Sequence, residues 1–235
     1  MKTPVFIYAP ESSFIIPYMR REFPGKGDIA ESFDDSPALA VMISSTDIYT
    51  PDEGWLDEEA AVNNKSPWVK LEEEFSAKAS ASGTPAYILR CAPIVGTGMT
   101  GSVRRLAESI YRGVFFHFPG NEARKSIVHA TDVARAARFI ADNTLAPRIY
   151  NLTDGADPTL HDIAEALAYR MDNKRISNLS TKPQQWFGRL VYGKERYSSY
   201  TSSELFSSSR IQAAGFKPTD TCDYMRNHIY DDSSL

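Results

Sequence analysis

The stretch ALAVMISSTD, residues 38–47, places six apolar residues directly before a run of hydroxyl and carboxylate side chains. An unbroken short apolar run is typical of a strand that is buried on both faces, as in a parallel sheet. Open α/β sheets bind their ligands outside the carboxyl ends of such strands. We therefore expect a strand over 38–43 and a ligand site beside Ser44 to Asp47.

Further short apolar runs alternate with helical patterns along the chain. Strands are predicted at 5–8, 86–89, 126–128 and 149–152, and helices at 67–81, 102–112, 131–142 and 159–171. A helix is also expected after Ser12 or Ser13, with Pro17 in its first turn. Residues 24–37 collect Pro, Gly, Asp and Ser, which predicts a loop. This order of elements predicts an α/β fold, with a shortened Rossmann-like parallel sheet flanked by helices.

Two local signals set helix boundaries and faces. Gly83 should end the helix over 67–81, and Thr159 should cap the last helix with Asp162 three positions further on. The apolar residues that we expect near one face of the helix over 67–81 are Val69, Leu71, Phe75 and Ala79.

Composition excludes several classes of protein. The chain has 235 residues, with 26 Lys and Arg against 30 Asp and Glu, and a net charge of −4 favours neither nucleic acid nor an anionic membrane as partner. Its two cysteines are too few for a disulfide scaffold, and no metal-binding spacing occurs. No apolar run reaches the ~18 residues that a membrane span needs. We expect a soluble cytoplasmic protein.

A literal dinucleotide fingerprint, G-x-G-x-x-G, occurs as GTGMTG at residues 96–101. Pro93 interrupts the strand that precedes it and cannot donate a hydrogen bond to a sheet ladder. We therefore favour a glycine-rich loop that opens a helix over a dinucleotide site.

A second candidate site combines Ser45 and Thr46, at the predicted strand end, with Lys70 on the next helix. A hydroxyl beside an ammonium can polarise a carbonyl or an alcohol, because the cation stabilises negative charge that develops on oxygen. Local sequence alone favours the other interpretation, a local turn stabilised by the Ser45 or Thr46 hydroxyl and a surface lysine.

Several segments, in the same order, resemble the extended short-chain dehydrogenase/reductase family of NAD-dependent epimerases and dehydratases. They are VMISSTDIY at 41–49, KLEEE at 70–74, ILR at 88–90 with VG at 95–96, KSIVHATDVA at 125–134, YNL at 150–152 and AAGFKP at 213–218. The resemblance implies a Rossmann-like core, residues 1–98 plus 126–153, interleaved with a small substrate-type region, residues 99–125 plus 154–235. It also implies NAD or NADP as cofactor and a nucleotide sugar as substrate.

The chain departs from this family at the proton relay. In the family a tyrosine four residues before the active-site lysine transfers the proton, and here Ser66 stands four residues before Lys70. An aliphatic hydroxyl has a far higher pKa than a phenol and is a poor acid or base at neutral pH. The resemblance therefore implies Ser45, Thr46 and Lys70 as the remaining catalytic positions.

The chain also departs from this family at the phosphate-binding loop. Aligning Phe14-Ile15 with the family's G-x-x-G-F-I-G loop replaces its glycines by Pro10, Ser13 and Ile16. Side chains at these positions block the close backbone approach that binds a pyrophosphate at a helix N-terminus. Between 6 and 43 there is also room for only one strand and one helix, so we expect the adenine half of the site to be missing.

Basic residues are the candidate substrate ligands. Lys125, with Arg124 beside it, matches the family residue that contacts the substrate diphosphate, although a solvated basic pair is an equal alternative. Arg90 is a further candidate, but a paired cation at a strand end explains it better. For Tyr192, Tyr197 and Tyr200, in a Ser-rich basic stretch, we favour a mobile surface loop over the lining of a substrate pocket.

Three functions remain open. The leading hypothesis is a divergent family member with weak or lost NAD(P) binding, which binds a nucleotide-sugar-like anion or a protein partner. The second is an active NAD(P)-dependent epimerase, dehydratase or reductase, in which Ser45 contacts the reacting oxygen and Lys70 orients the cofactor and the substrate. The third is a non-catalytic subunit that pairs with itself or an intact relative through the helix bearing Lys70.

Overall fold

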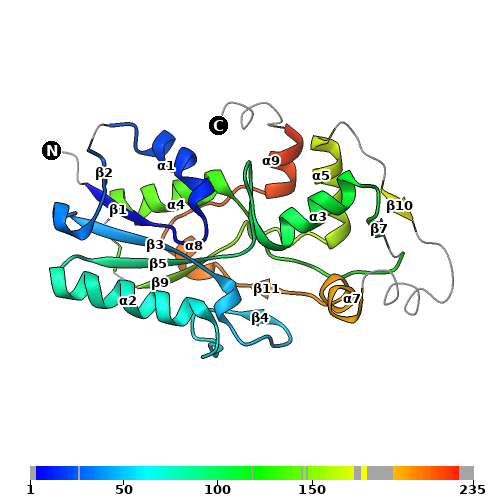
Figure 1. Ribbon diagram of the computed structural model, residues 1–235, viewed down its shortest axis with the longest axis horizontal. Coiled ribbons are helices and arrows are strands. Elements are labelled where there is room, and N and C mark those ends of the chain that lie inside the picture. The colour runs from blue at the N-terminus through cyan, green and yellow to red at the C-terminus, as the bar shows by residue number, and fades with distance from the viewer. Residues whose placement is uncertain are drawn as a thin grey trace.

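The computed structural model describes residues 4–25, 27–117, 119–143, 145–146, 148–171, 176–178 and 193–227. Its central sheet is parallel throughout and has the strand order β2-β1-β3-β5-β9 (Figure 1). These strands are Ile29–Ala30, Val5–Tyr8, Leu39–Ser45, Ala86–Cys91 and Ile149–Leu152. The predicted α/β fold is confirmed, and the strand expected at 38–43 is β3, which extends to Ser45.

The chain reverses its path across the sheet at β1. From β1 it runs through a 3-10 turn, η1 (Ser13–Ile15), and α1 (Ile16–Glu22) to the edge strand β2. It then returns past η2 (Phe33–Asp35) to β3, on the other side of β1. Such a switch point forms a crevice at the carboxyl ends of the two central strands.

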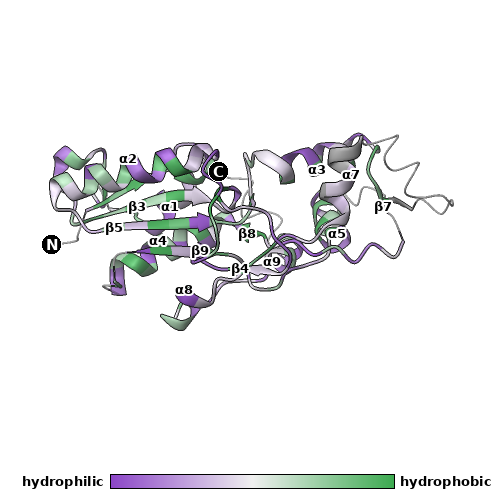
Figure 2. Cartoon of the chain, turned by 90° about the horizontal axis from the view of Figure 1, so that it is seen from below, coloured by the Kyte–Doolittle hydropathy of each residue, from purple (hydrophilic) through white to green (hydrophobic). Residues whose placement is uncertain are grey.

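Helices cover both faces of the sheet. The helices α1 and α4 (Ala130–Asn143) pack together on one face, and α2 (Pro67–Ser82) packs on β3 and β5 from the other. The alternating side chains of β3 follow this arrangement, because Val41 and Ile43 join the cluster under α1 and α4 while Ala40 and Met42 join the cluster under α2. In Figure 2 the apolar strands β3 and β5 lie between α2 and α4.

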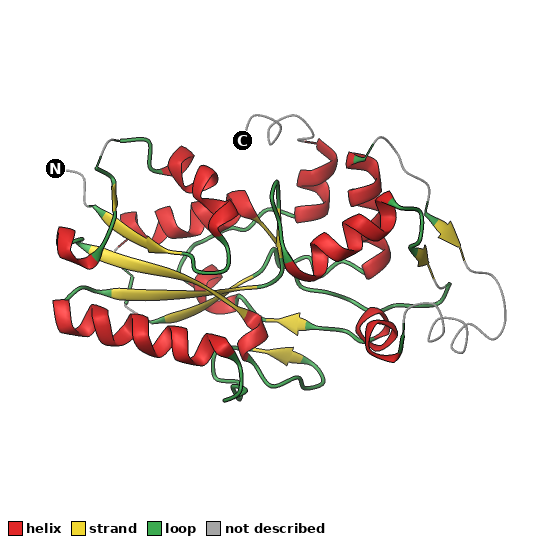
Figure 3. Ribbon diagram, in the orientation of Figure 1, coloured by secondary structure: helices red, strands yellow, loops and turns green. Residues whose placement is uncertain are grey.

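Beyond the carboxyl end of the sheet lie the helices α3 (Gly101–Tyr111), α5 (Leu160–Arg170) and α9 (Thr221–Asn227) (Figure 3), and a third apolar cluster lies between them. Three two-stranded ladders accompany it: β6 (Ile94–Val95) with β8 (Val128–His129), β7 (Phe116–His117) with β10 (Ser177–Asn178), and β4 (Trp55–Leu56) with β11 (Leu205–Phe206). The remaining elements are η3 (Thr46–Ile48), α7 (Lys194–Thr201) and α8 (Ser209–Ala213).

The cluster under α1 and α4 includes residues from the C-terminal part of the chain. Ile211 and Phe216, from the stretch assigned by sequence to the small region, pack with the sheet in the same cluster as Val5. Within the described residues, no helix combines the length and the apolar character that crossing a membrane requires.

The predicted helix ends agree with the structure. Gly83 ends α2 in the left-handed region, with φ of 68°, and Thr159 forms a reciprocal capping box with Asp162 at the start of α5. The loop expected over 24–37 was wrong in part, because that stretch contains β2 and η2. The strand β2 consists of two residues that pair with β1, so its extended shape depends on tertiary hydrogen bonds that the local sequence does not show.

Candidate functional site

The glycine-rich loop at 96–100 packs on the turn and helix that follow β1. The hydroxyl of Tyr18 accepts a hydrogen bond from the backbone N–H of Thr97 at 2.9 Å. A Cβ atom on Gly96 would lie 2.8 Å from this hydroxyl oxygen, and one on Gly98 would lie 3.0 Å from the Cβ of Phe14. These two glycines therefore allow the loop to approach η1 and α1 closely, and the loop leads directly into α3, as the favoured interpretation of the motif predicted.

The first helix does not offer the usual phosphate site. A dinucleotide pyrophosphate binds free N–H groups at the N-terminus of the helix after β1. Here α1 has only 7 residues, carries Pro17 in its first turn, and follows a 3-10 turn in which the Ile15 N–H donates to the carbonyl of Ser12. The positions Pro10, Ser13 and Ile16 add side chains to this turn. The residues present do not fit a pyrophosphate.

Ser45 and Thr46 close the end of β3. The Ser45 hydroxyl accepts the backbone N–H of Asp47 at 3.1 Å, so this serine stabilises the turn η3. The Thr46 hydroxyl is buried and has no hydrogen-bond partner within the described residues. No hydrogen bond joins either side chain to Lys70 in this part of the chain. Their role toward a reacting oxygen stays a prediction.

Lys70 lies on the outer side of α2. The residues of α2 that are buried are Trp68, Glu72, Phe75 and Ala79. Lys70 follows Trp68 by two residues, or about 200° around the helix, so its side chain is 81% exposed and pairs with Glu74 at 3.6 Å. Ser66, at the start of α2, donates its hydroxyl to the carbonyl of Asp47 at 3.4 Å.

The outer face of α2 is charged. It carries Lys70, Glu73, Glu74 and Lys78, which are all exposed. Pairing of two chains through this helix would bury few apolar side chains, and it stays a prediction.

A buried ion pair joins α2 to the sheet. Arg90 donates from Nε to Oε1 of Glu72 at 3.0 Å and from Nη2 to Oε2 at 2.7 Å, and Ser44 donates its hydroxyl to Oε1 at 2.6 Å. Burial lowers the pKa of Arg90, but the hydrogen bonds and the charge attraction to Glu72 and Tyr49 together raise it, so the pKa is raised overall. Arg90 is thus a paired strand-end cation, and Glu72 takes two of its donors.

Tyr49 extends this buried network to β9. The Arg90 guanidinium lies 5.0 Å from the centroid of the Tyr49 ring, and the Tyr49 hydroxyl donates to Oδ1 of Asn151 at 2.6 Å. The backbone N–H of Asn151 donates to Oε1 of Glu58 at 2.8 Å. Glu58 and Glu72 both stand in acidic stretches, which do not by themselves indicate buried residues. The helical spacing of Glu72 from Trp68 is the signal that identifies it.

Lys125 and Arg124 are not an equivalent solvated pair. Lys125 is 8% exposed, and its Nζ lies 3.1 Å from Oε1 of Glu204, whereas Arg124 is exposed and donates to the carbonyl of Asp157 at 3.1 Å. Burial lowers the pKa of Lys125 and the Glu204 carboxylate opposes this.

A small cavity of about 50 Å³ lies beside Lys125 and is lined in part by Ser102 and Tyr200. Tyr200 therefore lines a pocket, as one of the two interpretations predicted. Tyr192, named with it, lies outside the described residues. Among the described residues, no group of three or more His, Cys, Asp or Glu side chains is arranged to hold a metal ion.

Comparison with known proteins identifies the architecture. No family model and no curated protein matches the sequence. Among solved structures, UDP-N-acetylglucosamine 4-epimerase from Bacillus cereus is similar at 11% identity and a TM-score of 0.67, covering 97% of this chain and 95% of that one. RMD from Pseudomonas aeruginosa, complexed with NADPH, is similar at 15% identity and a TM-score of 0.64, covering 98% of each chain.

The human epimerase family protein SDR39U1 (isoform 2), solved with NADPH, is similar at 12% identity and a TM-score of 0.63, covering 98% of this chain and 99% of that one. Likeness at this level of identity concerns the fold. It agrees with the parallel sheet, the switch point at β1 and the order of the matching segments. The chain therefore has the Rossmann-like fold of the extended short-chain dehydrogenases/reductases of the epimerase type.

Proposed function

We propose that this chain is an epimerase-fold protein that lacks both a tight NAD(P) site and a Tyr–Lys proton relay, and that binds a small anionic ligand, such as a nucleotide sugar, at Lys125. The observation that carries the proposal is the packing of the loop at 96–100 on Tyr18 and Phe14.

The proposed loss of a tight NAD(P) site is supported by the space around the first helix. In this fold a dinucleotide lies across the switch point, with its pyrophosphate at the N-terminus of the helix after β1. That helix begins with a 3-10 turn and lacks the glycines, and the loop at 96–100 lies against it. The strand β2 has only two residues, which leaves little sheet to support an adenosine.

The proton relay lacks its phenol. Ser66 replaces the tyrosine and donates its hydroxyl to a backbone carbonyl, and Lys70 pairs with Glu74 at the surface. An aliphatic hydroxyl holds its proton too tightly to act as an acid or a base near neutral pH. These residues support ligand binding better than they support hydride and proton transfer.

The proposed binding of a small anionic ligand is supported by the surroundings of Lys125. Its ammonium is buried beside a cavity, and its partner Glu204 is half exposed. If the Glu204 side chain turns to solvent, a phosphate oxygen of a ligand can take its place at Nζ. A buried cation gains from such pairing, because burial alone costs it free energy.

The test is a titration followed by melting temperature and by tryptophan fluorescence. UDP-glucose, and UDP as the diphosphate without the sugar, are compared with NAD, NADH, NADP and NADPH at millimolar concentration. A ligand at ~100 times its Kd adds about 2.7 kcal/mol, which shifts the melting temperature by several degrees in a chain of this length. We expect this shift with UDP-glucose or UDP and none with the four dinucleotides.

Variants assign the site. Lys125→Met should abolish the shift, and Arg124→Ala, next to it but exposed, should keep it. Glu204→Gln frees the ammonium and should strengthen anion binding, which keeps the test informative if Lys125→Met folds poorly. A shift in melting temperature with any of the four dinucleotides would overturn the proposal that the NAD(P) site is lost. The proposal of an anion site at Lys125 would be overturned if neither UDP-glucose nor UDP shifts the melting temperature. It would also be overturned if the shift is unchanged in Lys125→Met.

A further inference from the structure

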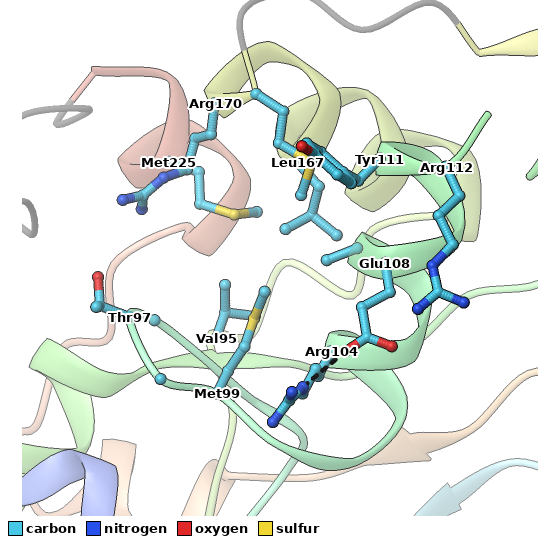
Figure 4. A pocket seen from close by; sticks show the side chains of 14 residues that line it. Val95, Thr97, Met99, Arg104, Glu108, Tyr111, Arg112, Leu167, Arg170 and Met225 are labelled. Carbon is cyan, nitrogen blue, oxygen red and sulfur yellow. Dashed lines mark hydrogen bonds and ion pairs between the residues drawn. The ribbon is translucent and has the colours of Figure 1, made fainter.

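A separate cleft of about 740 Å³ lies between the segment 95–99 and the helices α3, α5 and α9 (Figure 4). It shares no lining residue with the cavity beside Lys125. Its size is that of a pocket for a small organic molecule.

The floor of the cleft is apolar and rich in methionine. Val95, Leu167 and Met225 are buried, and Met99 and Met171 are half-buried. In Figure 4 the side chains of Val95, Met99, Leu167 and Met225 point into the same space. Three of the six methionines of the chain line this one cleft. Thioether side chains are flexible and polarizable, so they adapt to apolar ligands of different shape.

The rim of the cleft is basic. Arg104, Arg112 and Arg170 line it together with one carboxylate, Glu108. Arg104 pairs with Glu108 through Nε at 2.8 Å. The side chain of Arg112 donates no hydrogen bond within the described residues, and it extends from the end of α3 beside Glu108 (Figure 4). An excess of arginine here stands out in a chain whose net charge is −4.

We propose that this cleft binds a small amphipathic anion, with its apolar chain or ring on the methionine floor and its carboxylate or phosphate at Arg112. Binding sites of this size are mostly apolar, with a few polar groups that orient the ligand. A guanidinium can donate two parallel hydrogen bonds to two oxygens of the same carboxylate or phosphate group. The apolar floor excludes a fully hydrated polyanion, and the arginine rim disfavours a neutral hydrocarbon chain.

The test uses the fluorescence of 1-anilinonaphthalene-8-sulfonate, an aromatic sulfonate, titrated into the full chain. Laurate, dodecyl phosphate and dodecanol, which share one chain length and differ in head group, then compete with the probe. We expect one saturable site from which both anions displace the probe at about tenfold lower concentration than dodecanol, because only they pair with Arg112. If dodecanol competes as well as laurate, the arginine rim contributes nothing and the proposal fails.

Two variants and two controls locate the site. Arg112→Ala should weaken laurate binding about tenfold, as loss of a charged hydrogen bond predicts, and Met171→Gln should weaken it by placing an amide on the floor. Arg20→Ala removes an exposed arginine from α1, and Lys125→Met changes the other cavity. Both should leave laurate binding unchanged, and the melting temperature checks that each variant folds. Equal affinity in the native chain and in Arg112→Ala would overturn the proposal without affecting the one made for Lys125.

Discussion

The hydroxyl of Tyr18 in α1 accepts the backbone N–H of Thr97, 79 positions later, at 2.9 Å. This contact ties the loop that opens α3 to the helix that follows the first strand. The helix α1 is thereby packed against the chain's own loop.

Replacing Tyr18 with Phe should loosen this loop. The variant removes one hydrogen-bond acceptor and keeps the ring, so we expect the free energy of unfolding to fall by about 1 kcal/mol. Urea denaturation measures the loss, and amide hydrogen exchange should be faster at Thr97. The exposed Tyr169→Phe is the matched control and should change neither quantity. Unchanged exchange at Thr97 in the Tyr18 variant would contradict the role of the contact.

A side chain at Gly96 should clash. Its Cβ would lie 2.8 Å from the Tyr18 hydroxyl and 2.9 Å from the Cβ of Ala130, so Gly96→Ala should destabilise the chain by about 1–3 kcal/mol. Because Tyr18→Phe removes one of these two neighbours, the double variant should lose less stability than the sum of the single losses. Strict additivity in urea denaturation would show that the two residues do not touch.

Glu72 should be far more important for stability than its neighbour Glu73. Glu72→Gln removes the charge that pairs with the buried Arg90, and breaking such a pair typically costs about 3–5 kcal/mol. Glu73→Gln changes an exposed residue one position away and should stay within about 0.5 kcal/mol. Equilibrium urea denaturation of both variants provides the measurement, and similar effects would refute a buried Glu72.

Asp154 should make stability depend on pH. Burial raises the pKa of Asp154 from 3.8 to about 6, so between these values the folded chain binds a proton that the unfolded chain has released. Folding stability from this group is therefore present below pH 3.8 and lost as pH rises through about 6. Relative to Asp154→Asn, the native chain should gain about 2 kcal/mol between pH 7 and pH 4. Parallel curves for the two proteins would contradict the raised pKa.

Local patterns predicted much of the sheet and its helices. These elements depend on residues that are close in the sequence. Examples are the apolar run that forms β3, Gly83, which ends α2, and the Thr159–Asp162 capping box, which starts α5. The sequence did not predict the strand β2, because its two residues form a strand only by pairing with β1.

The site was harder to predict because its contacts join distant segments. Of the apolar residues expected near one face of α2, Phe75 and Ala79 are buried, and Val69 and Leu71 are partly buried against the same cluster. The pattern did not indicate Trp68 and Glu72, which are also buried, and Glu72 pairs with Arg90 on β5. Lys70 is left exposed to solvent. The burial of Lys125 depends likewise on Glu204, far along the chain, which no local pattern indicates.

Phe216 belongs to the same buried cluster as Val5 and Ile7, so this cluster cannot be complete until Phe216 has been synthesised. A ribosome adds about 5–20 residues per second, and Phe216 is made about 210 residues after Val5, so β1 waits at least about ten seconds for the last part of its core. Throughout this interval the cluster under α1 and α4 lacks the Phe216 side chain. The cluster around the first strand is therefore complete only after a residue far along the chain has been added.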